Sequence, residues 1–379
     1  MEVPMLDLSR QYACLRREVL DAVTRVCDSQ HYILGEEVAA FEHEFSLLCG
    51  VNHAVGCASG TDALWLALAA AGVAPGDEVI TTAFSFFATA SCITRAGARP
   101  VFVDIDPETL NLDPAKVEQK LKSRFLHLSA ILPVHLYGQC ADMTAFMRLG
   151  ADHKVAVIED AAQAVGASWE GKRAGSMGSA ATFSFYPTKN LSAFGDAGAL
   201  TTDDPVLAER VSRLRDHGSR RRYYHEEIGA NSRMDAIQAA VLRVKMPYLQ
   251  QWNSERRDRA GAYDQMFADA GLIKTGVASA PITLLKTRPE AHHIYHQYVI
   301  RAKRRDQLKA FLADRGIGTQ IYYPVPLHLQ ECFAYVGYAA SDLPETEAAA
   351  AEVLALPMFA ELRDEEQQYV VETIAEFYS

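Results

Sequence analysis

One lysine stands where a predicted strand gives way to a loop. The apolar run at 180–185 predicts a buried strand, Pro187 ends it, and the next residues present Lys189 beside threonine and asparagine. An amine at the mouth of a sheet can hold pyridoxal phosphate (PLP) as a Schiff base. Because most loop lysines are solvated charges, other residues must decide between these two interpretations.

Two acids end another predicted strand, at 156–160. An acid at the carboxyl end of a parallel strand lies where ligands bind in open α/β sheets. Asp160 in that position would keep a pyridine nitrogen protonated, which makes the cofactor ring an electron sink. The alternative is that Glu159 or Asp160 caps a following helix.

Small residues join a third predicted strand, at 53–58, to a helix. Ser59, Gly60 and Thr61 would allow a phosphate to approach the backbone N–H groups at the start of that helix. A helix cap without any ligand is the alternative interpretation.

Two more segments offer groups that a flat, phosphorylated cofactor would use. Phe86 follows the predicted strand 78–82, and its face could stack on a ring, although most such phenylalanines belong to a core. Asn231 and Arg233 precede a long predicted helix, where they could bind a phosphate or another anion, or simply form a turn.

The elements that must position these residues follow a regular alternation. Short apolar runs alternate with helical segments at 61–71, 88–96, 114–122 and 143–153, which indicates mainly parallel pairing in a doubly wound α/β fold. The last strand follows its predecessor without a helix, so we expect one antiparallel pairing. The seven predicted strands are 53–58, 78–82, 99–104, 129–135, 156–160, 180–185 and 199–202.

Helical patterns flank this alternation on both sides. Residues 5–50 read as helical with an interruption at 33–35, and a long helix extends from 235 to about 268. A strand at 297–300, a helix at 305–315, a strand at 318–323 and helices near 344–354 and 363–377 follow. We therefore predict a large domain at 1–254 and a small α+β domain at 255–379.

The composition is that of an ordinary globular enzyme. The formal net charge of −11 argues against a nucleic-acid or anionic-membrane surface, because both need basic side chains. The seven scattered cysteines indicate a reduced protein without a metal site. No signal peptide is evident, and the 16-residue uncharged run at 79–94 is too short and polar to span a bilayer. We expect a soluble, cytoplasmic protein.

The order of the phosphate cradle, aromatic residue, strand-end acid, strand-end lysine and asparagine loop resembles the DegT/DnrJ/EryC1 family. Its members are PLP-dependent sugar aminotransferases of fold type I. The resemblance extends from Asp7 to the C-terminal helices. It is most specific at 33–38, 59–64, 159–164, 184–191, 231–235 and 293–298.

This resemblance implies a PLP site with a defined set of residues. Lys189 would form the Schiff base and transfer protons, Asp160 would pair with the pyridine nitrogen, and Gln163 would hydrogen-bond the phenolic oxygen. Phe86 would stack on the ring. The phosphate would be held by Ser59, Gly60, Thr61 and Ser184.

The resemblance also implies a homodimer with shared active sites, because Asn231 would reach the phosphate of a neighbouring subunit. Substrate binding would fall to Tyr186, Arg220 and His293. Basic side chains at 220–222 could meet the diphosphate of a nucleotide sugar, although a solvated loop is the alternative.

The loop at 187–198 resembles that of family members that aminate 3-keto sugars. We therefore expect transfer of the amino group of L-glutamate to a dTDP- or UDP-linked keto-deoxysugar at C-3. Alternatives are a 4-keto-sugar or inosose aminotransferase, a PLP sugar dehydratase, and a regulatory protein without turnover. The dehydratases of the family replace the lysine with histidine, so Lys189 favours transamination.

Overall fold

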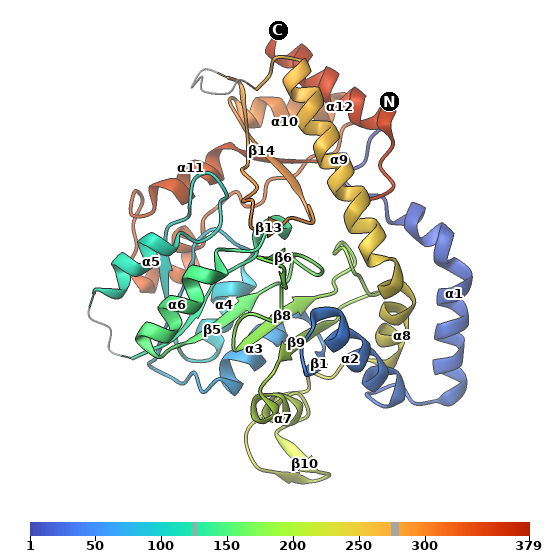
Figure 1. Cartoon of the computed structure of the whole chain (residues 1–379), viewed down its shortest axis with the longest axis vertical. Helices are drawn as coiled ribbons and strands as arrows, with labels where there is room; N and C mark the ends of the chain where they lie inside the picture. Colours follow the sequence, from blue (N-terminus) through green and yellow to red (C-terminus); the bar gives the residue numbers. More distant parts are fainter. Residues whose placement is uncertain (124–126, 274–279) are drawn as a thin grey trace.

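A seven-stranded sheet forms the centre of the computed structural model, which describes residues 1–123, 127–273 and 280–379 (Figure 1). The strand order is β1-β9-β8-β5-β4-β2-β3. The mainly parallel pairing is as predicted, but β9 is antiparallel to both of its neighbours, β1 and β8, where the sequence predicted one antiparallel pairing. The bounds are β1 His53–Cys57, β2 Glu78–Thr82, β3 Arg99–Val103, β4 Leu128–Leu132, β5 Ala156–Asp160, β8 Ala180–Ser184 and β9 Gly198–Thr202.

Helices cover both faces of this sheet, and each face has its own apolar core. Because side chains alternate along a strand, Val157 and Ile158 of β5 enter different cores. One core is covered by α3 Gly60–Ala70, α4 Ala88–Arg95 and α7 Pro205–Leu214. The other is covered by α2 Glu36–Cys49, α5 Pro114–Leu121, α6 Met143–His153 and α8 Ala236–Lys245.

The first helix, α1 Leu8–Ser29, packs against α8 on the outside of the molecule (Figure 1). The predicted break at 33–35 separates α1 from α2. It contains Leu34 and Gly35, both with positive φ. The N-terminal helical prediction is therefore confirmed.

A smaller α+β unit follows α9 Leu249–Asp269. An antiparallel sheet of β12 Ile282–Leu284, β14 Tyr298–Ala302 and β15 Val353–Leu356 packs on α9, α10 Arg305–Asp314 and α12 Asp364–Tyr378. α11 Pro344–Glu352 precedes β15. The predicted domain boundary at 254 falls within α9 and stays a prediction.

Short elements complete the described chain. They are β6 Ser168–Trp169, β7 Lys172–Arg173, β10 Ser219–Arg221, β11 Tyr224–His225 and β13 Ala291–His292, with 3-10 helices η1 Leu136–Gly138, η2 Met246–Tyr248, η3 Leu327–Leu329 and η4 Glu331–Val336. Within the described ranges, no helix has the length and apolar character needed to cross a bilayer.

The predicted strand at 318–323 is wrong. Gln320 makes a single bridge to Ala355 of β15, and the chain then leaves the small sheet. It does so because the next two tyrosines turn toward the large sheet: the Tyr137 hydroxyl donates to the Tyr322 carbonyl, and the Gln163 amide donates to the Tyr323 hydroxyl. The segment that pairs with β14 in the small sheet is instead β15, at a place where the sequence predicted the end of a helix at 344–354.

The start of β9 passes very close to the loop after β1. A Cβ atom at Gly198 would lie 2.4 Å from the Ser59 carbonyl carbon and oxygen, and 2.7 Å from the Gly60 nitrogen. These are backbone atoms that cannot rotate away. Glycine at 198 therefore permits the packing of β9 beneath the start of α3.

Gly198→Ala should therefore lower the melting temperature. The cost of overpacking is about 1–3 kcal/mol. The matched control is Gly261→Ala in α9, where a Cβ would meet nothing within 4 Å. That change should be neutral or stabilising by about 0.5–1 kcal/mol, because it removes backbone entropy from the unfolded chain. Thermal unfolding followed by circular dichroism compares the two, and an unchanged melting temperature for Gly198→Ala would contradict the steric argument.

Candidate active site

The predicted lysine and acid come together at the carboxyl edge of the sheet. Asp160 ends β5, and Lys189 follows β8 after a turn in which its backbone N–H donates to the Tyr186 carbonyl at 2.8 Å. β5 and β8 are parallel neighbours, so their ends lie side by side. This is the edge where open α/β sheets bind ligands.

Asp160 is buried among polar groups of the α3–α4 face. Its carboxylate accepts hydrogen bonds from the Thr89 hydroxyl at 2.7 Å and from the Ala162 backbone N–H at 3.3 Å. Burial raises the pKa of this carboxyl, and these hydrogen bonds and the charge of Lys189 only partly oppose the rise. A buried carboxylate in this position favours a cationic partner.

The same buried environment that raises the pKa of Asp160 lowers the pKa of Lys189. Burial lowers the pKa of its ammonium to about 8, against the charge of Asp160. Near neutral pH the amine therefore exchanges its proton easily, as a nucleophile and proton carrier must.

The residue after the lysine fixes the loop. The Asn190 amide donates to Asn253 Oδ1 at 2.7 Å, and Asn190 Oδ1 lies 3.1 Å from His296 Nδ1. Asn253 in turn donates to the Val165 carbonyl at 3.1 Å. These buried contacts tie the lysine loop to α9 and to the turn after β5.

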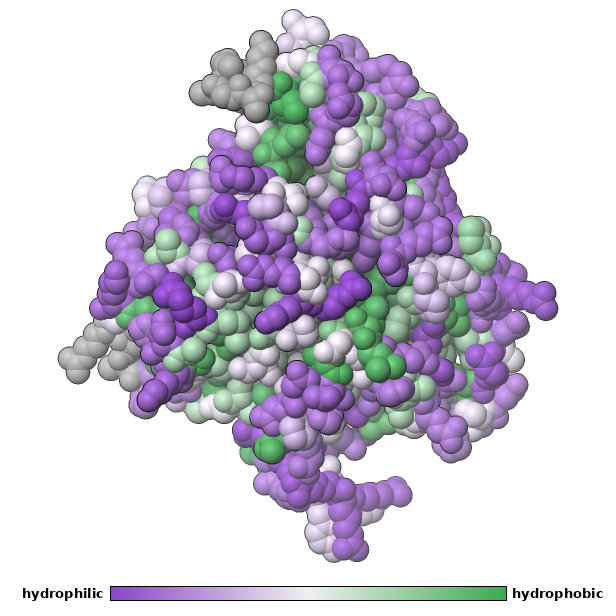
Figure 2. All heavy atoms as spheres, in the orientation of Figure 1, coloured by the Kyte–Doolittle hydropathy of each residue, from purple (hydrophilic) through white to green (hydrophobic). Residues whose placement is uncertain are grey.

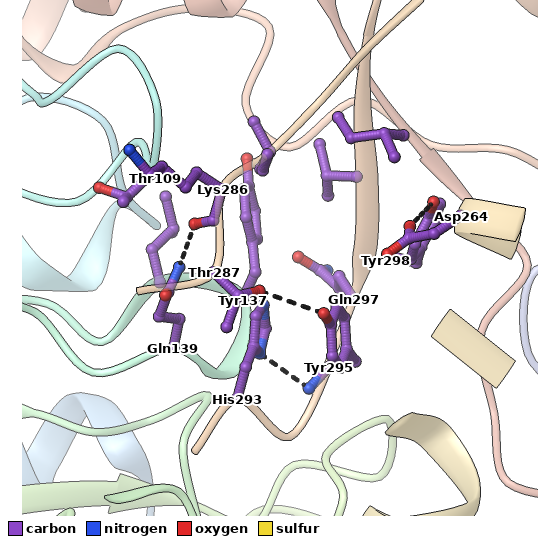
Figure 3. Close-up of a pocket in the computed structure, with 14 residues that line it drawn as sticks. Thr109, Tyr137, Gln139, Asp264, Lys286, Thr287, His293, Tyr295, Gln297 and Tyr298 are labelled. Atoms are coloured by element: carbon purple, nitrogen blue, oxygen red, sulfur yellow. Dashed lines mark hydrogen bonds between the residues drawn. The ribbon is translucent and has the colours of Figure 1, made fainter. Parts of the chain in front are cut away.

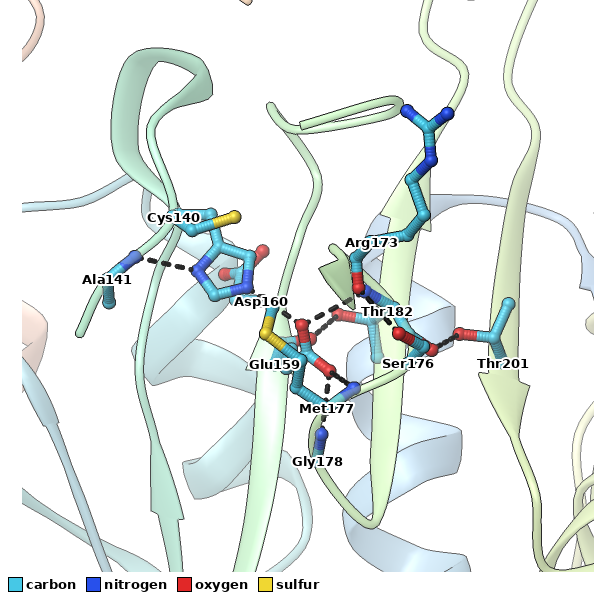
Figure 4. A network of polar contacts seen from close by, with 12 residues as sticks. Cys140, Ala141, Glu159, Asp160, Arg173, Ser176, Met177, Gly178, Thr182 and Thr201 are labelled. Carbon is cyan, nitrogen blue, oxygen red and sulfur yellow. Dashed lines mark hydrogen bonds and ion pairs between the residues drawn. The ribbon is translucent and has the colours of Figure 1, made fainter. Parts of the chain in front are cut away.

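Glu159, the other acid of the pair, points to the opposite face (Figure 4). Its carboxylate accepts backbone N–H groups of Gly175, Met177 and Gly178 at 2.8–2.9 Å and lies 2.9 Å from His135 Nε2. Because the Ala141 N–H donates to His135 Nδ1, the ring proton is on Nε2 and is donated to Glu159. No helix follows β5, so neither acid is a helix cap.

The predicted phosphate cradle surrounds the start of α3. Ser59 is the N-cap, and its hydroxyl accepts the Asp62 N–H at 3.1 Å. A Cβ at Gly60 would lie 2.6 Å from Ser184 Cβ, so the end of β8 touches the helix start. The first N–H groups of a helix have no intrahelical acceptor. Thr61 is exposed beside them. Ser59, Gly60, Thr61 and Ser184 therefore lie together.

Gln163 and Phe86 are joined to this edge through a tyrosine from the small unit. Gln163 accepts the Tyr137 N–H at 2.7 Å and donates to the Tyr323 hydroxyl at 3.0 Å. The Phe86 ring is 57% exposed and 6.3 Å from the Tyr323 ring. Phe86 therefore presents an exposed aromatic ring next to the tyrosine that Gln163 contacts.

The asparagine loop packs against the same helix start. The Ser232 hydroxyl donates to Asp62 at 2.8 Å, and the Ser232 carbonyl accepts the Ala58 N–H. Asn231 is exposed, and Arg233 pairs with Asp216 at 2.9 Å. Whether Asn231 serves its own chain or a neighbour stays a prediction.

Two of the three predicted substrate residues lie apart from this cluster. Arg220 is on the β10–β11 arm, which projects below the sheet in Figure 1 and is mainly hydrophilic in Figure 2. It pairs with Glu209 at 2.7 Å and with Glu226 at 3.6 Å. Tyr186, in contrast, is half-exposed and lies three residues before Lys189.

His293 lies in a different pocket, shown in Figure 3. It is buried, stacks on Tyr295 with ring centroids 3.8 Å apart, and accepts the Tyr295 N–H at 3.0 Å. His296 is the histidine close to the lysine, because burial and the charge of Lys189 both lower the pKa of His296. The substrate roles of Tyr186, Arg220 and His293 stay predictions.

Sequence reasoning missed four residues of this cluster: Thr89, Asn190, His296 and Tyr323. Thr89 carries a signal, because it lies four residues after Ser85, whose hydroxyl it contacts, and three residues after Phe86. Tyr323 and His296 are more than 100 residues from their partners. Their positions depend on how the small unit packs.

Comparison with known proteins decides the family. The model of the DegT/DnrJ/EryC1/StrS aminotransferase family matches residues 13–375. This chain belongs to that family. The predicted family, enzyme class and fold class are confirmed.

Relatives in this aminotransferase family match over nearly their whole lengths. The chain is 52% identical over 378 residues to a "Pleiotropic regulatory protein" of Geobacillus stearothermophilus, which covers 100% of this chain and 99% of the relative. It is 43% identical to a dTDP-3-amino-3,4,6-trideoxy-alpha-D-glucose transaminase of Streptomyces venezuelae, over 99% of this chain and 96% of the relative.

Solved structures of the family superpose closely. DesV of S. venezuelae, in complex with a ketimine intermediate, has a TM-score of 0.94 and 43% identity, and the match covers 99% of this chain and 98% of DesV. NtdA of Bacillus subtilis, with bound cofactor PMP, has a TM-score of 0.89 and 31% identity, covering 99% of this chain and 85% of NtdA.

The Glu159 network generates a stability prediction. Although burial raises the pKa of Glu159, the hydrogen bonds from His135 and from the N–H groups of Gly175 and Gly178 outweigh it, so the net shift is downward from 4.5. Stability from a carboxylate with a lowered pKa is full above the unfolded pKa and is lost as the pH falls through the folded pKa.

Glu159→Gln should therefore destabilise the protein at pH 7 by about 1.5–3 kcal/mol for each charge-assisted hydrogen bond that is lost, because it removes the charged acceptor of a buried network. The difference in melting temperature from the wild type should narrow as the pH falls below 4.5. The control is Glu118→Gln, whose half-exposed bridge to Arg148 at 3.0 Å should add little to stability because solvent screens it. If the difference in melting temperature between Glu159→Gln and the wild type did not change with pH, the stabilising role of the Glu159 charge would be contradicted.

Proposed function

We propose that this chain transfers the amino group of L-glutamate to C-3 of a dTDP- or UDP-linked keto-deoxysugar, with PLP as cofactor. The observation that carries the proposal is that Lys189, whose pKa lies near 8, feels the charge of buried Asp160 at the sheet edge. The S. venezuelae relative acts, by its name, in forming a dTDP-3-amino sugar. Its near-complete coverage supports the same substrate class.

The residues present fit PLP. Gly60 and Ser184 approach so closely that no side chain fits between them, and the N–H groups at the start of α3 suit an anion. Asp160 supplies a carboxylate for a ring nitrogen, and Phe86 supplies an exposed aromatic face. Ser59, Thr61, Gln163 and Asn231 complete the proposed set.

When bound, PLP supplies an electron sink for charge that develops at the amino-bearing carbon. The chain supplies the rest. Asp160, in its low-dielectric site, would hold a proton on the ring nitrogen. Lys189 Nζ, with a pKa of about 8, would take a proton from the amino-bearing carbon and return one, because its two protonation states are close in free energy at neutral pH.

Tyr186, Arg220 and His293 remain our proposed substrate residues. Tyr186 borders the loop of Lys189. The β10–β11 arm carries Arg220 away from its own cluster, so Arg220 would reach a nucleotide diphosphate only in a second copy of the chain. We propose a homodimer with shared sites, located in the cytoplasm, where the seven free cysteine thiols would stay reduced.

A regulatory protein without turnover is the second candidate, because the G. stearothermophilus relative carries a regulatory name. A binding role alone would not need an amine whose pKa is near neutrality beside a buried acid. Turnover therefore separates the two candidates.

The decisive assay incubates the PLP-loaded protein with L-glutamate and a panel of dTDP- and UDP-linked 3-keto and 4-keto sugars. We expect 2-oxoglutarate and a 3-amino sugar, both detected by mass spectrometry. Lys189→Ala should abolish turnover and the visible absorbance of lysine-bound cofactor, whereas exposed Lys172→Ala should retain both. Full turnover by Lys189→Ala, or none by the wild type with any sugar, would overturn the proposal.

Shared sites are tested by mixing two defective chains. Lys189→Ala and Asn231→Ala each impair every site in their own homodimers. If Asn231 serves the neighbour, a mixed dimer contains one intact site, so random mixing should restore roughly a quarter of the wild-type sites. If Asn231 serves its own chain, mixing restores none. Activity after co-refolding equal amounts measures the difference.

A further inference from the structure

A second buried lysine lies outside the proposed active site. Lys245, near the end of α8, is only 4% exposed. Its Nζ donates to the Ser192 hydroxyl at 2.9 Å and stands 4.9 Å from the centre of the Phe194 ring. An ammonium has three N–H donors, so these contacts leave it under-satisfied.

This lysine also lacks an acid partner. Across the described ranges, no carboxylate lies within ion-pair distance of Lys245. Glu361 acts on it only at longer range. Burial of an unpaired ammonium is costly, and this cost lowers the pKa of Lys245 to about 8. The amine is still mostly protonated at neutral pH.

Lys245 lines a pocket of about 300 Å³ together with Ser192 and Phe194, the two residues that its amine contacts. The pocket lies between the start of α1 and the loop that follows Lys189. Its wall contains neither Lys189 nor Asp160, but it shares Pro187 and residues 192–194 with the lysine loop. The apolar part of the wall comes from Leu8, Tyr12, Pro187, Ala193 and Phe194.

We infer that this pocket binds a small amphipathic carboxylate, whose apolar body lies among these side chains and whose anionic end pairs with Lys245. Charge complementarity carries the inference, because Lys245 is a buried cation without an acid and the only charged residue in a wall whose other members are apolar or, at Ser9, Gln11 and Ser192, uncharged polar residues. The size suits a small ligand. Inorganic phosphate suits it poorly, since a dianion needs several donors and this wall offers one charged group.

An occupant would also contact the loop that presents Lys189. Phe194, 46% exposed, lies edge-on to Tyr12 with ring centroids 5.6 Å apart, and the Phe194 backbone N–H donates to Gln238 of α8 at 2.8 Å. The pocket is thus part of the support of this loop, at a place distinct from the cradle. The inference does not depend on the identity of the sugar.

The test is calorimetric titration of the PLP-loaded protein with octanoate at pH 7. We expect saturable binding of one octanoate per chain, and weaker binding of the uncharged 1-octanol by at least about tenfold, the loss expected for one charge-assisted contact. Lys245→Met should weaken octanoate binding by a similar factor, and Lys245→Arg should restore it. The control is Lys172→Met, on an exposed strand, with no change.

Three outcomes would overturn the inference. The first is that octanoate does not bind, which includes the case in which a second copy of the chain covers the pocket. The second is that octanoate and 1-octanol bind equally well. The third is that Lys245→Met binds octanoate as tightly as the wild type. The comparison of octanoate with 1-octanol uses the wild type, so it decides the question even if Lys245→Met fails to fold.

Discussion

Two adjacent carboxylates at the end of β5 are buried on opposite faces of the sheet, and the structure is arranged to hold both. Glu159 is almost fully satisfied, with three backbone N–H groups and His135. Asp160 receives two hydrogen bonds and stays short of partners, so its pKa is raised. The first acid fixes the backbone that positions the second. The charge of the second acid, Asp160, acts on Lys189 and would act on the ring nitrogen of the cofactor that we propose.

The lysine opposite Asp160 is held by equally specific contacts. A chain of side-chain amides, Asn190 to Asn253, links its loop to α9, which carries the small unit. Burial moves the pKa values of Lys189 and Asp160 toward each other, which is the pattern of a site that moves protons. Lys245 shows the same cost of burial without an acid, at the far side of the same loop.

The sequence predicted the central sheet well because each strand there is a short apolar run between helices, a strictly local signal. Site residues at strand ends were predictable for the same reason, since parallel strands end at one edge. The predicted strand at 318–323 was wrong because its apolar residues, including Tyr322 and Tyr323, pack against residues that follow strands of the large sheet rather than forming a ladder. Local pattern cannot distinguish these two uses of apolar residues.

The sequence by itself determined the family, the order of the strands along the chain, and the presence of Lys189 beside a strand-end acid. The tertiary structure alone decided that Glu159 and Asp160 have separate roles, because the choice depends on which face each side chain enters. It also decided that His296, not His293, stands by the lysine, and that Thr89 and Tyr323 join the cluster. These contacts join residues far apart in the chain: Thr89 reaches Asp160 because α4 packs on the large sheet, and the small unit must pack against that sheet to bring in Tyr323.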